Sequence, residues 1–424
     1  MRFLLVNPFV LDFACYDYWL KPLGLLYLSA ILKKAGHEVE LVDCMDRHSE
    51  VLPDTHDDRY GKGKFILAKT VKPDILKQYP RKYSIYGIYG SMLNNILKLK
   101  QRPDMILLTC TMTYWYIGAA ETANILRETF PGVPLIIGGA YATLCPEHAA
   151  INVDADKIIT GSGFSGLFDL IGEETVPFEE WPAPDYSHYR KVPYVVMRTS
   201  IGCPNRCTYC SIDSICPEYR KKDKDRLSEE VGELLKYQTD DFVFYDDALL
   251  SNNSLYEFLE TAPQNLRFHT PNGMEVKKID SATARLLKKA GFTEPCISVD
   301  IIDEIMEGVP GAKLRKHDIE ISAENLFSSG YRTGEVHAYL ILGRPGQDIS
   351  KIKDSVRYLH KLGLKVRLAE YAVVPQTADA EGFPGSVISE PLLHNNSIFP
   401  SYDLDKWDEI FDLKEYTVRI NDEL

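Results

Sequence analysis

The sequence predicts an α/β protein built in two parts. Short apolar runs alternate with helical patterns through the first 170 residues, and the same alternation resumes after residue 193. Residues 173–193 are rich in proline and aromatic residues and poor in helix formers, which is typical of a linker. A chain of 424 residues is also too long for one ordinary core. We therefore expect domains at residues 1–172 and 194–380, and an extension over residues 381–424.

The first domain is expected to hold a doubly wound, Rossmann-like parallel sheet. A helix over residues 24–35 follows from the apolar stripe at Leu25, Leu28, Ile31 and Leu32, which Gly36 ends. Residues 44–89 interrupt the alternation and are expected to be an insertion packed on the sheet. Ligands of such sheets bind outside the carboxyl ends of the strands. The expected strands are residues 2–7, 38–43, 105–110, 135–138 and 157–160.

The second domain is expected to contain six strands that alternate with helices. The expected strands are residues 195–200, 242–245, 267–270, 297–299, 336–342 and 366–373. The expected helices are residues 227–237, 282–290, 319–328 and 352–362. Residues 402–416 are amphipathic, and we expect them to cover the end of this domain or to pack on its side.

Composition restricts the classes of function. Hydrophobic content of 45% with 26% charged residues is typical of a globular protein, and no apolar run approaches the ~20 residues of a membrane helix. The amino terminus lacks a signal-peptide cleavage site, and the nine cysteines form no disulfide framework, so we expect a cytoplasmic protein. A net charge of −13 argues against nucleic acid as a partner.

Three cysteines within eight residues carry the strongest chemical signal. Cys203, Cys207 and Cys210 are spaced Cys-x3-Cys-x2-Cys directly after an expected strand. Such thiolates select iron–sulfur clusters, zinc or Cu(I). A structural zinc site needs a fourth ligand, and no partner follows at zinc-ribbon spacing. A 4Fe-4S cluster held by three cysteines would keep one iron open.

This loop resembles the signature of the radical S-adenosylmethionine (radical SAM) enzymes, Cys-x3-Cys-x-aromatic-Cys, with Tyr209 at the aromatic position. The resemblance implies a partial six-stranded (β/α) barrel in which these cysteines bind a 4Fe-4S cluster. In that family the open iron binds S-adenosylmethionine, and the reduced cluster cleaves it to a radical that abstracts hydrogen from the substrate. It also implies an external electron donor of the flavodoxin or ferredoxin type.

The same resemblance implies further residues that contact S-adenosylmethionine. Asp246, or failing it Asp247, stands where the family holds the amino group, and a carboxylate is the natural acceptor for an ammonium. The alternative for this pair is a helix cap. The sequence Arg344-Pro345-Gly346 resembles a family turn near adenine. The other implied cofactor residues are Asn272, Ser298, Asp300 and Leu342.

Alternation along the fifth strand of the second domain suggests candidates for catalysis. Val336, Ala338, Leu340 and Leu342 share one aliphatic side, which should face the helices. The opposite side should then point into the barrel, where a substrate radical would form. Its members are either catalytic or a mutually satisfied interior group, and they are Glu335, His337 and Tyr339.

The first domain resembles the cobalamin-binding-type domain that precedes some radical SAM domains. The resemblance rests on residues 22–25, on Gly138-Gly139-Ala140 and on Gly161-Ser162-Gly163-Phe164 after successive strands. The cobalt-ligating Asp-x-His-x-x-Gly motif is not matched, because Asp54-Thr55-His56 lies in the insertion and lacks the glycine. Two interpretations stand: a bound cobalamin, or a scaffold that helps to close the active site.

The leading hypothesis is a radical SAM enzyme acting on a small molecule or a peptide. With cobalamin, methyl transfer to an unactivated carbon is expected; without it, a radical rearrangement, a cyclisation or C–S bond formation fits. A methylthiotransferase is the alternative within the enzymes, although its three further cluster cysteines are not evident in the spacing of Cys15, Cys44, Cys110 and Cys145. A sensor or binding protein with a structural metal is the non-enzymatic alternative.

Overall fold

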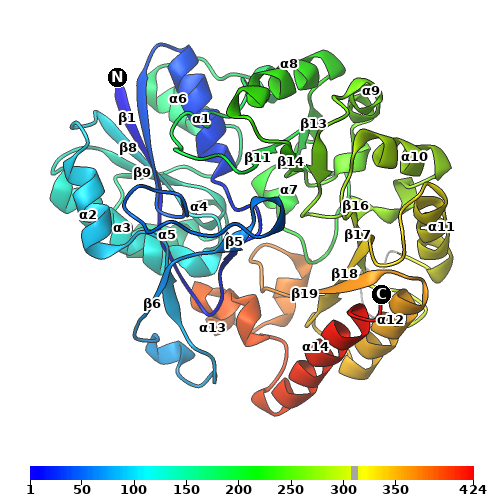
Figure 1. Ribbon diagram of the computed structural model, residues 1–424. Helices are drawn as coiled ribbons and strands as arrows, with labels where there is room; N and C mark the ends of the chain where they lie inside the picture. Colours follow the sequence, from blue (N-terminus) through cyan, green and yellow to red (C-terminus); the bar gives the residue numbers. More distant parts are fainter. Residues whose placement is uncertain (307–313) are drawn as a thin grey trace.

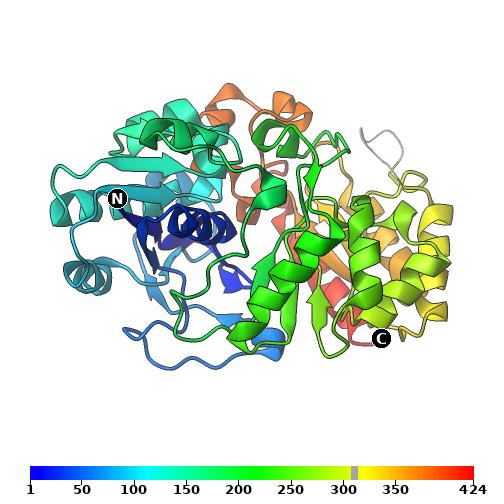
Figure 2. The same ribbon diagram turned by 90° about the horizontal axis from the view of Figure 1, so that it is seen from above.

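The computed structural model, which describes residues 1–306 and 314–424, shows two α/β units side by side. The amino-terminal unit, coloured blue to cyan, lies beside the barrel unit, coloured green to yellow, in both views (Figures 1 and 2). One hydrophobic core runs through both units, since it includes Leu26 and Tyr27 of the first and Val195 and Phe244 of the second. The two units are therefore packed together as one body.

The amino-terminal unit is built on a five-stranded parallel sheet in the order β10-β9-β8-β1-β4. Chain order reverses between β1 and β8, so the carboxyl ends of these strands are the expected ligand edge of a doubly wound sheet. The prediction of such a sheet is confirmed. Its strands are β1 (Arg2–Asn7), β4 (Glu38–Asp43), β8 (Met105–Thr109), β9 (Leu135–Gly138) and β10 (Lys157–Ile158).

Helices cover both faces of this sheet (Figure 1). The expected apolar stripe of α1 is buried, and this helix ends where Gly36 adopts a φ of 88°, a left-handed conformation that favours glycine. The helices of this unit are α1 (Leu23–Lys34), α2 (Gly90–Lys98), α3 (Tyr116–Thr129), α4 (Ala140–Leu144), α5 (Pro146–Asn152) and α6 (Ser165–Ile171).

The insertion after β4 forms strands with the loop that follows β1. β2 (Val10–Asp12) pairs with β7 (Ser84–Tyr86), which pairs with β6 (Leu67–Lys69). β3 (Tyr16–Asp17) pairs with β5 (Gly63–Lys64) to make a small β3–β5 ribbon that lies next to the barrel unit (Figure 1). The insertion therefore shapes the ligand edge of the first sheet and reaches the second unit.

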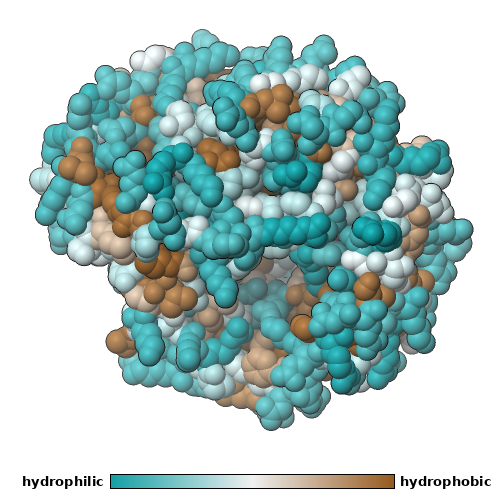
Figure 3. All heavy atoms as spheres, viewed as in Figure 1, coloured by the Kyte–Doolittle hydropathy of each residue, from teal (hydrophilic) through white to brown (hydrophobic). Residues whose placement is uncertain are grey.

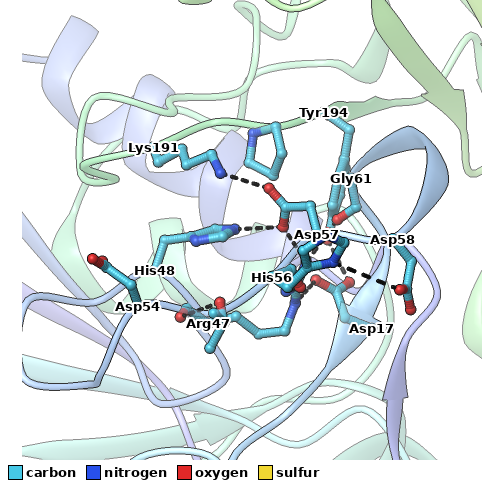
Figure 4. Close-up of polar contacts among 12 residues, drawn as sticks. Asp17, Arg47, His48, Asp54, His56, Asp57, Asp58, Gly61, Lys191 and Tyr194 are labelled. Carbon is cyan, nitrogen blue, oxygen red and sulfur yellow. Dashed lines mark hydrogen bonds and ion pairs between the residues drawn. The ribbon is translucent and has the colours of Figure 1, made fainter.

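A buried ion network anchors this insertion (Figure 4). The Arg47 guanidinium donates to Asp17 at 2.7 Å and to Asp57 at 2.9 Å, and Arg47 is only 2% exposed. Lys191, from the linker, donates to Asp57 at 2.6 Å. The network thus ties the insertion to the β1 loop and to the linker. His56 lies in the same segment, but its side chain is 91% exposed and pairs only loosely with Asp58.

The second unit is an open parallel barrel in two arcs, one of three strands and one of four. One arc has the order β11-β14-β15 and the other β16-β17-β18-β19, and a Phe268–Phe292 bridge lies between them. The family expectation of a partial barrel fits this arrangement. The strands are β11 (Val195–Met197), β14 (Asp241–Phe244), β15 (Arg267–His269), the short β16 (Met274–Glu275), β17 (Cys296–Asp300), β18 (His337–Leu342) and β19 (Lys365–Glu370).

Helices cover the outside of the barrel. The sequence predicted four of them to within a few residues and did not predict α9, which Asn252 caps by accepting from Ser254 N–H. The helices are α8 (Lys224–Leu234), α9 (Asn253–Thr261), α10 (Ser281–Ala290), α11 (Lys316–Ser328) and α12 (Ile349–Lys361).

The carboxyl-terminal extension contacts both units. α14 (Trp407–Asn421) packs on α12 and β19, as expected for a helix on the side of the barrel. The segment before it, which includes α13 (Gly385–Ile388), runs between the two units, and there Asn395 donates to Asp12 at 2.8 Å. None of the helices in the described ranges has the length and apolar character needed to cross a membrane.

Candidate active site

The cysteine loop starts from a turn that requires glycine. Gly202 has a φ of 73°, and a Cβ at this position would lie 2.5 Å from the Glu218 carbonyl oxygen. After this turn Cys203 and Cys207 are half-buried and Cys210 is more exposed. The local chain is compact, because Cys210 N–H donates to the Cys207 carbonyl.

All three cysteines line one cavity of about 700 Å³ at the carboxyl ends of the barrel strands. The predicted cofactor residues Asp247, Asn272, Ser298 and Asp300 line the same cavity. We call this space the cluster cavity. Chemistry in β/α barrels gathers at this end of the strands, so the placement agrees with a catalytic loop.

The thiols of this loop are suited to a cluster. Partial burial raises the pKa of Cys203, so iron must displace a proton when it binds there. In residues 1–306 and 314–424, no three His, Cys, Asp or Glu side chains converge closely enough for a single metal ion. A 4Fe-4S cluster does not need that convergence, because each thiolate ligates a different iron. The donor set therefore fits a cluster.

Tyr209 and Arg344 fix the middle of the loop. The Tyr209 hydroxyl donates to Asp300 at 2.7 Å. Arg344, 1% exposed, donates to the Thr208 hydroxyl at 2.9 Å and lies 4.8 Å from the centre of the Tyr209 ring. Its guanidinium also makes a two-point contact with Asp379, at 2.7 and 2.9 Å, and Asp379 N–H donates to the Thr208 carbonyl. The segment that follows β19 thereby holds the loop through Asp379 and Arg344.

Asp246 does not face the cluster cavity, which corrects the first choice for the S-adenosylmethionine amino group. Its carboxylate is buried and accepts from the amide and hydroxyl groups of Thr199 and Ser200 at 2.6–3.1 Å. Burial raises its pKa to about 6. Asp246 thus orders the chain that leads into the cysteine loop, whereas Asp247 faces the cavity and pairs with Arg198 at 3.2 Å.

The remaining predicted cofactor residues differ in their surroundings. Asn272 follows β15 and donates to the Asp246 carbonyl, and Ser298 of β17 lies beside it. Leu342, at the end of β18, is fully buried in the hydrophobic core and does not line the cluster cavity. A side-chain contact from Leu342 to a ligand in this cavity is therefore not supported, because the aliphatic side of β18 faces the helices.

The three catalytic candidates that were predicted from alternation along β18 lie in different surroundings in the structure. The prediction that Glu335 points into the barrel is wrong, because it precedes the strand and pairs with Arg332 and Lys288 near the surface. His337 begins β18 at the amino end of the barrel, away from the cysteines, and is 8% exposed. Tyr339 does face inward: a Cβ on Gly273 would lie 3.2 Å from its ring.

A second cavity, of about 300 Å³, lies at the carboxyl edge of the amino-terminal sheet. Apolar side chains and glycines line most of it, including Gly24, Gly161 and Gly163, where a Cβ would meet nothing within 4 Å. We call it the apolar cavity. Arg198 lines it and pairs with Asp247 of the cluster cavity, so the two spaces adjoin.

The cysteines of the amino-terminal unit do not gather into a second cysteine loop in the described part of the chain. Cys110 lies near Cys145, but Cys44 lies beside Asp43 and Cys15 lies near Asp12 and Asp17. This arrangement gives no support to the three further cluster ligands of a methylthiotransferase.

Sequence reasoning missed Asp379 and Glu275 at this site. Glu275 lines the cluster cavity and accepts from Leu250 N–H and the Ser251 hydroxyl. Asp379 lies in a stretch without strand or helix periodicity, so its pairing with Arg344 had no signal in the sequence. The sequence does show an arginine in the turn after β18, and a fully buried arginine is usually paired with a carboxylate.

Comparison with known proteins agrees with this site. Residues 197–381 match the profile of the Radical SAM superfamily. The cytidylyl-2-hydroxyethylphosphonate methyltransferase of Streptomyces wedmorensis is 22% identical over 410 residues, covering 81% of this chain and 73% of the relative. An uncharacterized methyltransferase of Pyrococcus horikoshii is also 22% identical, covering 69% of this chain and 70% of the relative.

Two solved structures share the two-part fold. The radical S-adenosylmethionine methyltransferase TsrM from Kitasatospora setae, with cobalamin and a [4Fe-4S] cluster bound, aligns with a TM-score of 0.64 at 17% identity, over 89% of this chain and 73% of that one. The cobalamin-dependent S-adenosylmethionine radical enzyme OxsB aligns with a TM-score of 0.61 at 14% identity, over 95% of this chain and 56% of that one. Residues 197–381 thus match a radical SAM domain, and the chain shares the two-part fold of these two structures.

Proposed function

We propose that this chain is a cobalamin-dependent radical SAM methyltransferase that acts on an unactivated carbon of a small molecule or a peptide. The observation that carries the proposal is the pair of adjoining cavities, one lined by three cysteines and one by apolar side chains and glycines. The names of the relatives and of the solved structures support it, since they include methyltransferases and cobalamin-bound enzymes.

The residues have distinct proposed roles. Cys203, Cys207 and Cys210 would hold the cluster and leave one iron for S-adenosylmethionine. Asp247 would accept from the amino group of that cofactor, while Asn272 and Ser298 border the same space. When bound, the cluster would supply the electron for cleavage of S-adenosylmethionine, and cobalamin would supply a transferable methyl group. An external donor of the flavodoxin or ferredoxin type would deliver the electron.

The apolar cavity fits part of a cobalamin and not a whole one, because about 300 Å³ is too small for the entire cofactor. Its open glycines make room for a flat group at the ends of β9 and β10, and no histidine lines it. Cobalamin would therefore bind without a histidine ligand from this cavity. The remainder of the cofactor would lie toward Arg198 and the cluster cavity.

Cysteine variants test the radical chemistry. Each of Cys203→Ala, Cys207→Ala and Cys210→Ala should abolish the 4Fe-4S chromophore and S-adenosylmethionine cleavage together, since a three-cysteine site has no spare ligand. Cys216→Ala is the matched control. Its thiol is buried, contacts the Glu218 carbonyl and does not line the cluster cavity. A Cys216→Ala protein that loses its iron would contradict the open site.

A glycine pair tests the cobalamin proposal. Gly24→Leu should fill the apolar cavity without backbone strain and abolish corrin absorption bands after anaerobic reconstitution with cobalamin. Gly232→Leu, at an exposed position of α8 with equal room for a Cβ, is the control and should leave the bands intact. A brown wild-type protein that acquires no corrin bands would favour a cobalamin-independent rearrangement or cyclisation.

A further inference from the structure

Barrel-interior positions on β17, β18 and β19 form one polar layer beside the cluster cavity. Ser298, Tyr339 and Arg367 are opposite one another in the registers of the three parallel strands, so their side chains share one side of the arc. Ser298 lines the cluster cavity. After a register shift on β17, Asp300 at the end of this strand accepts from Tyr209 of the cysteine loop. Arg367 thus lies deeper in the barrel than the contact between β17 and the cysteine loop.

Arg367 lacks an acidic partner. Its guanidinium donates to the Tyr18 hydroxyl, and the Cζ atom lies 5.1 Å from the centre of the Tyr18 ring. It makes no ion pair within residues 1–306 and 314–424, and burial lowers its pKa to about 10. Burying an unpaired charge is costly, so a fold that retains one usually does so for a ligand.

Two lysines extend this charge, and they too form no ion pair in the described ranges. The Lys62 ammonium, from the insertion, lies 4.8 Å from the centre of the same Tyr18 ring. Lys365 lies two residues before Arg367 on the same side of β19. Both lysines lie close enough to His337 to lower its pKa, and the Nδ1 atom of this buried histidine has no hydrogen-bond partner among residues 1–306 and 314–424.

The space between the β3–β5 ribbon and β19 is open to solvent on one face. Figure 3 shows the surface hollowed in the middle, where Figure 1 places β5 and β19. The β3–β5 ribbon carries Tyr18 and Lys62 next to its strands and brings them to the open edge of the barrel. In a chain of net charge −13, Arg367 and Lys62 bring two positive charges to the same Tyr18 ring, while Lys365 lines a separate cavity with Glu294 and His337.

We propose that Arg367, together with Lys62, binds an anionic group of the substrate inside the barrel, next to the cluster cavity. The group is a carboxylate or a phosphate, since a guanidinium fork matches the oxygens of both. This inference rests on the proposed function in calling the ligand a substrate. It narrows the substrate class to anions that reach from the ribbon side of the barrel to the radical site.

Calorimetric titration of the reconstituted full chain tests this site. Sodium phosphate and sodium acetate are titrated separately, at ionic strength held constant with sodium chloride, and the anion that binds identifies the group. Saturable binding of at least one is expected, and Arg367→Gln should weaken it at least about tenfold. Arg357→Gln is the control, because Arg357 is half exposed and paired with Asp354 on α12; its affinity should not change.

A second pair of variants covers a failure of Arg367→Gln to fold. Lys62→Gln should weaken anion binding at least about threefold, and Arg367→Lys should bind more weakly than wild type, since it keeps the charge and loses the fork. Wild-type protein that binds neither anion, or variants with wild-type affinity, would overturn the inference. S-adenosylmethionine cleavage is measured on the same samples. Cleavage without anion binding refutes this site alone, and anion binding without cleavage refutes the proposed function alone.

Discussion

Arg344 and Arg367 are two arginines at one side of the barrel, a buried one following β18 and a half-buried one within β19. Arg344 has a two-point contact with Asp379 and a hydrogen bond to the cysteine loop. Arg367 donates to the Tyr18 hydroxyl and forms no ion pair with a carboxylate in the described ranges. A paired buried charge fixes a position, whereas an unpaired one is available to a ligand. The difference separates the residues that build this site from those expected to bind at it.

Removing the partner of Arg344 should have the largest effect. Asp379→Ala removes the two-point carboxylate contact of a buried guanidinium, and we expect a loss of about 3–5 kcal/mol in the free energy of unfolding. The iron content should also fall, because the cysteine loop loses the contacts through which Asp379 holds Thr208 and Arg344. The double variant Arg344→Met/Asp379→Ala removes the charge as well and should recover part of the stability. Anaerobic denaturant unfolding and iron analysis measure both, and an additive double variant would contradict a coupled pair.

The adjacent carboxylates Asp246 and Asp247 also differ in role: one is expected to stabilise the fold and the other to bind the cofactor. Asp246→Ala leaves buried amide and hydroxyl donors of Thr199 and Ser200 unsatisfied and should cost about 2–3 kcal/mol of stability. Asp247→Asn should leave stability nearly unchanged and weaken S-adenosylmethionine binding. Thermal unfolding and equilibrium binding of the cofactor distinguish the two outcomes. Equal losses of stability in both variants would show that Asp247 is structural too.

Substitution of Arg367 should change the free energy of unfolding in the opposite direction from the loss of the Arg344–Asp379 contact. Arg367→Met removes a charge that burial disfavours, so the unfolding free energy should stay equal or rise by about 1 kcal/mol. Anion binding and substrate turnover should be lost in the same protein. Denaturant unfolding without added anion measures the first effect. A destabilisation above about 2 kcal/mol would place Arg367 with the structural residues.

The smallest expected effect is on the titration of His337. Burial, Lys365 and Lys62 lower its pKa to about 4, against the nearby Glu294, which raises it. Its contribution to stability is therefore complete above the ordinary pKa of about 6.5 and is lost as the pH falls toward 4. Bound phosphate should raise the pKa by about one unit. An NMR titration of this histidine with and without phosphate measures the shift, and Arg367→Gln should reduce it.

The sequence was informative where periodicity or spacing carried the signal. Alternation predicted the strands of both sheets and the aliphatic side of β18, and spacing identified Cys203, Cys207 and Cys210. It failed where long-range pairing decides. Asp246 and Asp247 are adjacent and chemically alike, and only the packing of Thr199 and Ser200 assigns one to the interior. Glu335 fits the alternation in the sequence, but the strand begins only at His337. The Glu335 side chain therefore belongs to the preceding turn, where it accepts from Arg332 N–H.

The contact of Asp379 with Thr208 also bears on biosynthesis. A ribosome makes the cysteine loop long before it makes the segment that clamps this loop, and the Asp12–Asn395 contact is completed later still. A nascent chain therefore presents its three thiols before the residues that hold them in place exist. Iron delivered at that stage would meet an unclamped loop, so stable cluster loading is expected to follow release of the finished chain.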